Sequence, residues 1–119
     1  MFKNFFPSKI LKLTNKTINN LVFFLIIISV IGLVYSLVLS PADYIQGDSV
    51  RIMYVHVPSS FIAIGTFGII GTASIINLVF KNKITPLIAK SLSSVGFLFA
   101  IISIITGSLW GKPTWGIWW

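Results

Sequence analysis

The single histidine and the four tryptophans of this chain are the residues whose types and spacing best suit chemistry. His56 stands in the segment YVHVP, and the tryptophans all fall within residues 110–119. An imidazole can bind a soft metal or move a proton near neutral pH. Indole rings offer broad, rigid apolar faces. The tryptophan-rich segment therefore suits a flat apolar ligand, although tryptophans beside a membrane span commonly form only an interfacial belt.

Other common chemistries lack their residues. The chain has no cysteine and only two acidic residues, Asp43 and Asp48, which excludes disulfides, thiolate metal sites and the Cys-x-x-Cys-His attachment of c-type haem. No Ser/His/Asp set and no Gly-rich loop followed by Lys-Ser or Lys-Thr is present, so hydrolysis and ATP binding have no motif here. We predict that the chain is not an enzyme and that another polypeptide binds any ATP.

Three uncharged runs dominate the sequence, which is 55% hydrophobic and 9% charged. They cover residues 21–39, 61–80 and 92–110, and each has about the 20 residues that a helix needs to cross a bilayer. Backbone groups in lipid must be satisfied internally, and no alternating pattern indicates a barrel. We predict an all-α integral membrane protein with three transmembrane helices in one membrane domain, 1–119. The first run is too long for a typical signal peptide, and Pro41 makes a poor cleavage site.

The cations sort by loop, and this predicts how the helices cross the membrane. Within the net charge of +7, four lysines precede the first run and three lie between the second and the third. Positive residues collect on the cytoplasmic side, so the N-terminus is predicted there, while the loop 40–56 and the segment 110–119 share the outer face. Topology explains the charge, and no nucleic-acid partner is predicted. The lysines are Lys3, Lys9, Lys12, Lys16, Lys81, Lys83 and Lys90.

Small residues at helical spacing predict close helix packing in the two later runs. The rows are Gly65, Gly68 and Thr72 in the second run, and Gly96, Ala100, Ser103 and Gly107 in the third. They favour a bundle with further helices from this or another chain. Gly111, Pro113 and Gly116 are expected to stop the third helix, so that the indoles fan out as a platform.

Antiparallel packing of the second and third helices would bring His56 and the first tryptophan into the same outer leaflet. An imidazole beside indoles suits haem, whose macrocycle lies against aromatic faces while its iron takes a nitrogen ligand. We predict transient, non-covalent binding of b-type haem with His56 as the metal ligand. Arg51 and Lys112 are predicted to meet the two propionates, although a role as interface anchors fits them equally well. The tryptophans predicted to contact haem are Trp110, Trp115, Trp118 and Trp119.

Two segments resemble the CcmC family of haem exporter proteins, within the wider "WWD" haem-handling group. They are PADYIQGDSVRIMYVHVP at 41–58 and TGSLWGKPTWGIWW at 106–119. By position, His56 matches the first axial histidine of that family, and the four tryptophans match the opening of its tryptophan-rich segment. Ile117 stands where a threonine is common. The His56 loop argues against CcmF or the CcsA type, the other members considered.

The resemblance implies a six-helix bundle of which this chain would form the N-terminal half. The second axial histidine and the rest of the tryptophan-rich segment would lie elsewhere, so a fragment or one half of a split protein is expected. The implied partners are haem, the membrane-anchored haem chaperone CcmE, the small protein CcmD, the ABC-type CcmA/CcmB complex, the lipid bilayer and a C-terminal half if the protein is split. The implied location is the bacterial or mitochondrial inner membrane, with the tryptophans on the periplasmic or intermembrane side.

The leading hypothesis is haem transport in c-type cytochrome biogenesis, in which the protein presents haem at the outer face to the chaperone. The alternative is a non-catalytic membrane assembly subunit whose tryptophans are only interfacial anchors and whose small-residue rows recruit partner helices. The two hypotheses differ in one observable. Replacing tryptophans by leucine abolishes haem retention under the first and preserves anchoring under the second.

Overall fold

Three long α-helices make up the described part of the chain. The computed structural model describes residues 8–118, with side chains from residue 15 onward. The helices are α1 (Ser8–Val34), α2 (Val50–Phe80) and α3 (Thr85–Trp115), and a short π-helical turn at Tyr35–Leu39 follows α1. All three are long and apolar enough to cross a membrane. The prediction of an all-α membrane protein with three spanning helices is confirmed.

The chain divides into two compact units, residues 1–35 and residues 36–119. In the first unit, every described side chain of α1 is exposed, which suits an apolar helix that meets lipid or other helices all round. Most of the N-terminal lysines used for the topology, together with Trp119, lie outside the residues whose side chains are described. The cytoplasmic N-terminus and the single membrane domain 1–119 therefore stay predictions.

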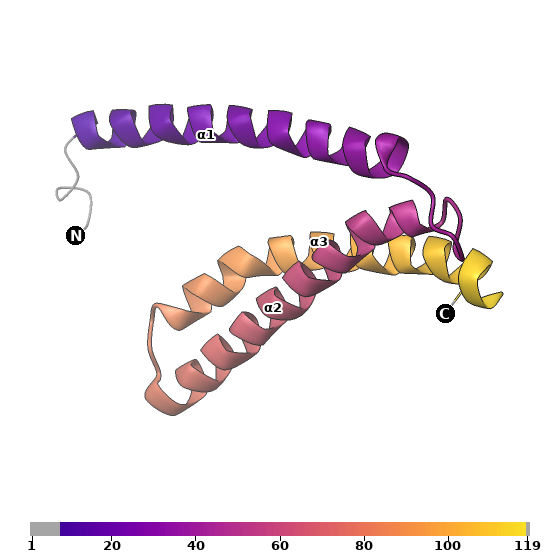
Figure 1. The fold of residues 1–119 in the computed structure, drawn as a ribbon. Helices are drawn as coiled ribbons and strands as arrows, with labels where there is room; N and C mark the ends of the chain where they lie inside the picture. The colour runs from indigo at the N-terminus through magenta and orange to yellow at the C-terminus, as the bar shows by residue number, and fades with distance from the viewer. Residues whose placement is uncertain (1–7, 119) are drawn as a thin grey trace. The chain divides into compact units, whose positions relative to one another are not determined.

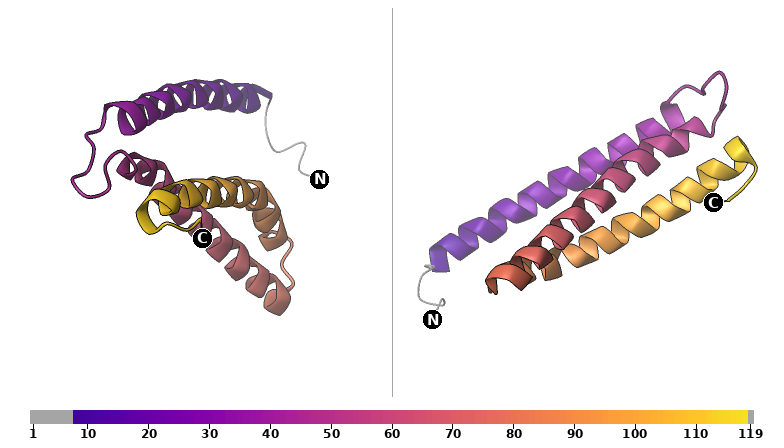
Figure 2. Two further views of the ribbon diagram at one scale, coloured as in Figure 1. Left: turned by 90° about the vertical axis from the view of Figure 1, so that its right-hand side faces the viewer. Right: turned by 90° about the horizontal axis from the view of Figure 1, so that it is seen from below.

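In the second unit, α2 and α3 form an antiparallel hairpin (Figures 1 and 2). Lys81 ends α2 in the left-handed region at φ 48°, and its N–H donates to the carbonyl of Asn77 over 2.8 Å. Asn82 accepts the N–H of Ile84 through its side-chain oxygen at 2.7 Å. A proline at the start of α3 has no N–H that the first turn would leave unpaired. These local bonds reverse the chain within four residues, 81–84.

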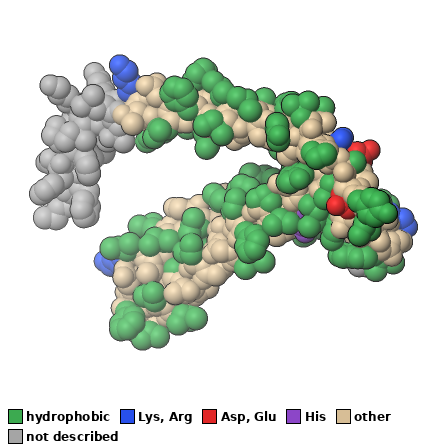
Figure 3. Space-filling view, viewed as in Figure 1, with side chains coloured by type: hydrophobic (Ala, Val, Ile, Leu, Met, Phe, Trp, Pro, Cys, Tyr) green, Lys and Arg blue, Asp and Glu red, His purple; other side chains and the backbone are tan. Residues whose placement is uncertain are grey.

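Small residues, rather than bulky apolar ones, line the contact between the two helices. The buried residues of α2 are Ser59, Ala63, Thr66 and Ala73, and those of α3 are Thr85, Gly96 and Gly111, of which Gly111 is covered by Trp115 and Ile117. A Cβ placed on Gly96 would lie 3.0 Å from Cγ2 of Thr66, so the backbones approach closely where glycine permits it. Hydrophobic side chains are instead spread along the visible outer face of the hairpin (Figure 3). This is the pattern of helices that pack within a bilayer.

The two predicted rows of small residues have different outcomes. The row in α3 faces α2 at Gly96, Ser103 and Gly107. The row in α2 does not face α3, since a Cβ on Gly65 or Gly68 would meet nothing within 4 Å. The contact face of α2 runs instead through Ser59, Ala63, Thr66 and Ala73, and it lies about 140° round the helix from the glycine row.

The expectation that the third helix stops near residue 110 is wrong. α3 continues through Gly111 and Pro113 to Trp115 and ends at Gly116, which has φ 79° and donates its N–H to Lys112. Pro113 has no N–H to donate to the carbonyl of Leu109, so α3 lacks that one bond, and the helix ends two residues later. Two of the tryptophans are thus carried by a helix rather than by an irregular platform.

A compact loop joins the π-helical turn to α2. Asp43 and Gly47 pair their backbones through two hydrogen bonds of 3.0 Å. The Asp43 carboxylate also accepts the N–H groups of Gln46 at 2.8 Å and Ile45 at 2.9 Å. These two bonds, with that to Gln46 the stronger influence, hold the pKa of Asp43 below its ordinary value.

We predict that Gly96→Ala destabilises the hairpin by about 1 kcal/mol or more relative to Gly68→Ala. The new methyl at position 96 presses on the β-branched Thr66, whereas the one at position 68 meets open space and improves helix propensity. Unfolding of both variants in detergent micelles, followed by circular dichroism, measures the difference. Equal stability would show that the helices do not approach closely at Gly96.

We also predict that Asp43 titrates below the ordinary range of an aspartate. Because its pKa is lowered in the folded loop, its stabilising effect is complete above the unfolded value of about 3.9 and is lost as the pH falls through the folded value. The amide signals of Ile45 and Gln46 in an NMR titration report this transition. In Asp43→Asn, which keeps a neutral acceptor, these signals should lose that pH dependence, and an unchanged titration would contradict the assignment.

Candidate haem site

His56 lies in the second turn of α2, and its side chain lies against the backbone of α3. The imidazole is half-buried. A Cβ on Gly107 would lie 2.8 Å from Cε1 of this ring, so the ring occupies the space that any other residue at 107 would fill. The close approach predicted by antiparallel packing is confirmed, because the imidazole stacks on the indole of Trp110 with ring centroids 6.3 Å apart and planes 19° from parallel.

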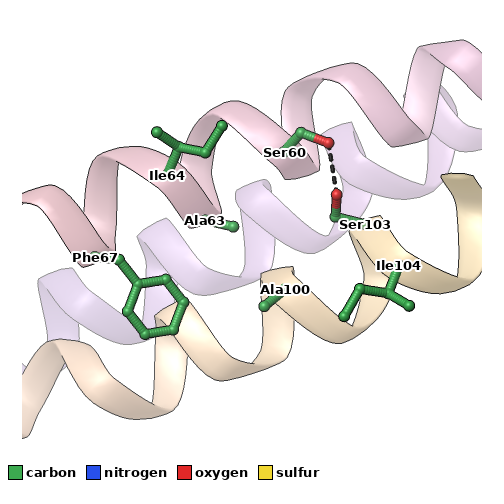
Figure 4. A pocket seen from close by; sticks show the side chains of 7 residues that line it. All are labelled: Ser60, Ala63, Ile64, Phe67, Ala100, Ser103 and Ile104. Carbon is green, nitrogen blue, oxygen red and sulfur yellow. Dashed lines mark hydrogen bonds between the residues drawn. The ribbon is translucent and has the colours of Figure 1, made fainter.

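A polar cluster surrounds His56 between the helices. Nδ1 of His56 lies 3.0 Å from the carbonyl oxygen of Ser103 and 3.2 Å from the hydroxyl of Thr106. The Ser60 hydroxyl donates to the carbonyl of His56 over 2.8 Å and lies 2.6 Å from the hydroxyl of Ser103 (Figure 4). We call His56, Ser60, Ser103, Thr106 and Gly107 the His56 cluster. Its hydrogen bonds join α2 to α3 at the point where the imidazole of His56 lies between the two helices.

Trp110 is held from two further sides. Its indole N–H donates to the side-chain oxygen of Gln46 over 3.0 Å, which ties the loop before α2 to the end of α3. The ring of Trp115 meets it edge to face, with centroids 4.6 Å apart and planes at 74°. The Trp115 ring lies over Gly111, where a Cβ would stand 3.5 Å from it, in ordinary van der Waals contact.

The last described residues add a second aromatic wall. Trp118 is exposed, and the ammonium of Lys112 stands over its ring at 5.6 Å from the centroid. The same ammonium donates to the carbonyl of Gly116 over 3.1 Å. Lys112 therefore braces the turn after α3, in the geometry of a cation over an aromatic face. The predicted contribution of Trp119 lies outside the described residues.

These side chains line a groove of about 600 Å³, which we call the Trp groove. Its volume falls in the range of about 300–1,000 Å³ that small-molecule sites occupy. Its wall is mostly apolar and aromatic, and His56 contributes an imidazole to it. The lining residues are His56, Ser103, Ile104, Gly107, Ser108, Trp110, Gly111, Trp115, Ile117 and Trp118.

A second hollow continues from the Trp groove along the same pair of helices. This lateral groove has a volume of about 450 Å³ and is lined by Ser60, Ala63, Ile64, Phe67, Ala100, Ser103 and Ile104 (Figure 4). It shares Ser103 and Ile104 with the Trp groove. The His56 cluster therefore stands where the two grooves meet.

Arg51 has structural partners in the loop. Its guanidinium donates to the carbonyl of Ser40 over 3.0 Å and pairs with Asp48 at 3.3 Å. It does not line the Trp groove, and neither does Lys112. The predicted role of these two cations toward propionates stays a prediction. The geometry places both of them as braces of the segments on either side of the groove.

Reasoning from the sequence missed Gln46, Ser60 and Thr106. Ser103 and Gly107 were noted only as small packing residues. The sequence carried one signal for this cluster, which is that Ser60, Ser103 and Thr106 place hydroxyl groups in otherwise apolar helices. Hydroxyls buried between membrane helices usually hydrogen-bond across them. Nothing in the sequence pairs Gln46 with Trp110, which stands 64 residues later.

Comparison with known proteins identifies relatives of this chain. The family described as heme exporter protein C matches the chain over residues 1–119. The heme exporter protein C of Haemophilus influenzae is 43% identical over 89 residues, which is 75% of this chain and 36% of that protein. That of Escherichia coli K12 is 37% identical over 94 residues, 79% of this chain and 38% of the relative.

A third relative extends the match toward the N-terminus. The heme exporter protein C of Bradyrhizobium diazoefficiens is 36% identical over 113 residues, 95% of this chain and 43% of the relative. The chain thus spans about two fifths of the length of the curated relatives that it matches. The family match covers the whole chain, including the His56 cluster and the Trp groove, and the chain belongs to the heme exporter protein C (CcmC) family.

Proposed function

We propose that this chain belongs to a haem-handling protein that holds haem at the outer face of its membrane and passes it on for maturation of c-type cytochromes. The observation that carries the proposal is the stacked pair of His56 and Trp110 in the wall of an aromatic groove. The names of the relatives support haem as the cargo. The chain covers a minor part of those relatives, so the full handover activity belongs to the proposal as well.

The residues present fit haem. His56 supplies a ring nitrogen, and the groove of about 600 Å³ supplies a largely apolar wall for a flat macrocycle. Trp110, Trp115 and Trp118 supply the aromatic faces. A single histidine offers one axial ligand, and the described residues contain no group of three or more His, Cys, Asp or Glu that could hold a separate metal ion.

The proposal extends to the membrane and the partners. The outer face in question is that of the bacterial or mitochondrial inner membrane, and the recipient is a CcmE-like haem chaperone. CcmD and the CcmA/CcmB complex would work with it. The CcmA/CcmB complex would bind the ATP, because this sequence has no nucleotide-binding motif. The protein has no chemical turnover of its own and binds, orients and releases haem.

A second candidate function rests on a different surface. Gly65 and Gly68 leave open space on α2, away from α3, and such a face suits another membrane helix. Under this alternative the chain is an assembly subunit, and its tryptophans serve only as interfacial anchors. The two functions make different predictions for the tryptophans.

The first test replaces the ligand while keeping its hydrogen bond. In His56→Asn, the amide nitrogen can take the place of Nδ1 and donate to Ser103, while no nitrogen replaces Nε2. We expect the apparent Kd for ferric haem in detergent micelles, measured from the Soret band, to rise at least about tenfold. His56→Ala should do the same. Unchanged Soret spectra and affinities in both variants would remove His56 from the site.

The second test separates haem binding from anchoring. We expect the double variant Trp115→Leu/Trp118→Leu to insert in the membrane normally and to lose haem retention by about tenfold or more. Phe97→Leu is the matched control, since Phe97 is as exposed as Trp115, at 65%, and lies on α3 outside the grooves. Retained haem in the double variant would favour the assembly subunit.

A further inference from the structure

The hydrogen bonds around His56 determine which of its two ring nitrogens carries the proton. Nδ1 has two neighbours within bonding distance, the carbonyl oxygen of Ser103 at 3.0 Å and the hydroxyl oxygen of Thr106 at 3.2 Å. A carbonyl oxygen can only accept a hydrogen bond. The contact with Ser103 is therefore a bond only if Nδ1 carries a hydrogen.

The Thr106 hydroxyl leads to the same assignment. Its hydrogen is committed to the carbonyl of Ile102, one turn earlier in α3, over 2.6 Å. The oxygen of Thr106 therefore has only lone pairs to offer to His56. Both neighbours of Nδ1 are acceptors, and a neutral imidazole with a hydrogen on Nδ1 has a free lone pair on Nε2.

The remaining members of the His56 cluster hold the ring in this place. Ser60 donates its hydroxyl hydrogen to the carbonyl of His56, so the 2.6 Å contact between Ser60 and Ser103 is donated by Ser103. This chain of bonds sets the register of α2 against α3. Gly107 then provides the space, because a Cβ there would stand 2.8 Å from Cε1 and 3.2 Å from Nδ1.

We propose that Ser103, Thr106 and Gly107 are positioning residues that hold His56 in the Nδ1–H tautomer and leave Nε2 as the ligand nitrogen for the Trp groove. The identity of the ligand rests on the proposed function, but the tautomer does not. Within the described residues no side chain bonds Nε2, and His56 lines the Trp groove. Hydrogen-bond partners on the other ring nitrogen orient a metal-binding histidine and set its basicity.

The chemical nature of the partners bears on how tightly such a ligand binds. A carboxylate on Nδ1–H would draw the proton and make Nε2 a stronger donor. Here both acceptors are neutral oxygens. Neutral acceptors draw the Nδ1 proton less than a carboxylate would, and the weaker Nε2 donor that results suits a bond that has to form and break during transfer.

Nitrogen NMR of the free protein tests the tautomer directly. The chain has one histidine, so protein labelled with nitrogen-15 histidine in micelles gives a single pair of ring signals. At about pH 8, where an ordinary imidazole is neutral, we expect the hydrogen on Nδ1 and the lone pair on Nε2. A ring found mainly in the Nε2–H form would overturn the proposal.

Variants test the positioning residues with the same readout. We expect Gly107→Ala to displace the ring, and Thr106→Val, which keeps the shape of the side chain, to change the tautomer ratio about fivefold toward Nε2–H. Thr106→Ser should behave as the wild type, and Gly96→Ala serves as a control for helix packing away from the cluster. An unchanged ratio in Thr106→Val and Gly107→Ala would refute the assignment of these residues.

A titration with ferric haem distinguishes this inference from the proposed function. If the tautomer is as expected, we expect Gly107→Ala to weaken haem binding about tenfold while Gly96→Ala does not. The expected tautomer together with absent haem binding would refute the proposed function alone. The opposite tautomer together with haem binding that depends on His56 would refute this inference alone.

Discussion

The close approach of α2 and α3 at His56 is the contact on which the rest of this structure depends. An imidazole can reach the backbone of a neighbouring helix only where that helix has no side chain in the way, and Gly107 meets this condition. Once the ring lies there, Ser103 and Thr106 bind Nδ1 and Trp110 covers its face. Burial of a polar ring between membrane helices is acceptable because its polar edge is hydrogen-bonded.

The rest of the interface follows the same physical rule. Lipid tails are as apolar as leucine, so burying large hydrophobic side chains gains little between membrane helices. Only two apolar side chains in the described residues are buried, Ala63 and Ala73, and both are small. Close packing and interhelical hydrogen bonds such as Ser60–Ser103 supply the stability instead. Bulky side chains face outward, toward lipid or toward further helices.

The aromatic end is built outward from this interface in a series of contacts. Trp110 stacks on His56, Trp115 meets Trp110 edge to face, and Lys112 lies over Trp118. Gln46 binds the indole N–H of Trp110, so the position of the loop affects the wall of the groove. Cargo in the Trp groove would therefore touch rings whose positions are set by the interface and the loop together. Gly116 ends α3 in the left-handed region at φ 79°, which glycine adopts without strain.

The sequence by itself determined the all-α class, the three spanning helices and the pairing of His56 with Trp110, because hydrophobic run length and antiparallel order depend on chain position alone. It misjudged the end of α3, because Gly111 and Pro113 do not stop the helix, which runs on to Gly116. Only the tertiary structure decided that Gln46 holds Trp110, that Arg51 braces a loop and that Ser103 and Thr106 face Nδ1. These contacts join residues distant in the chain, and they depend on helix rotation and register that spacing does not encode.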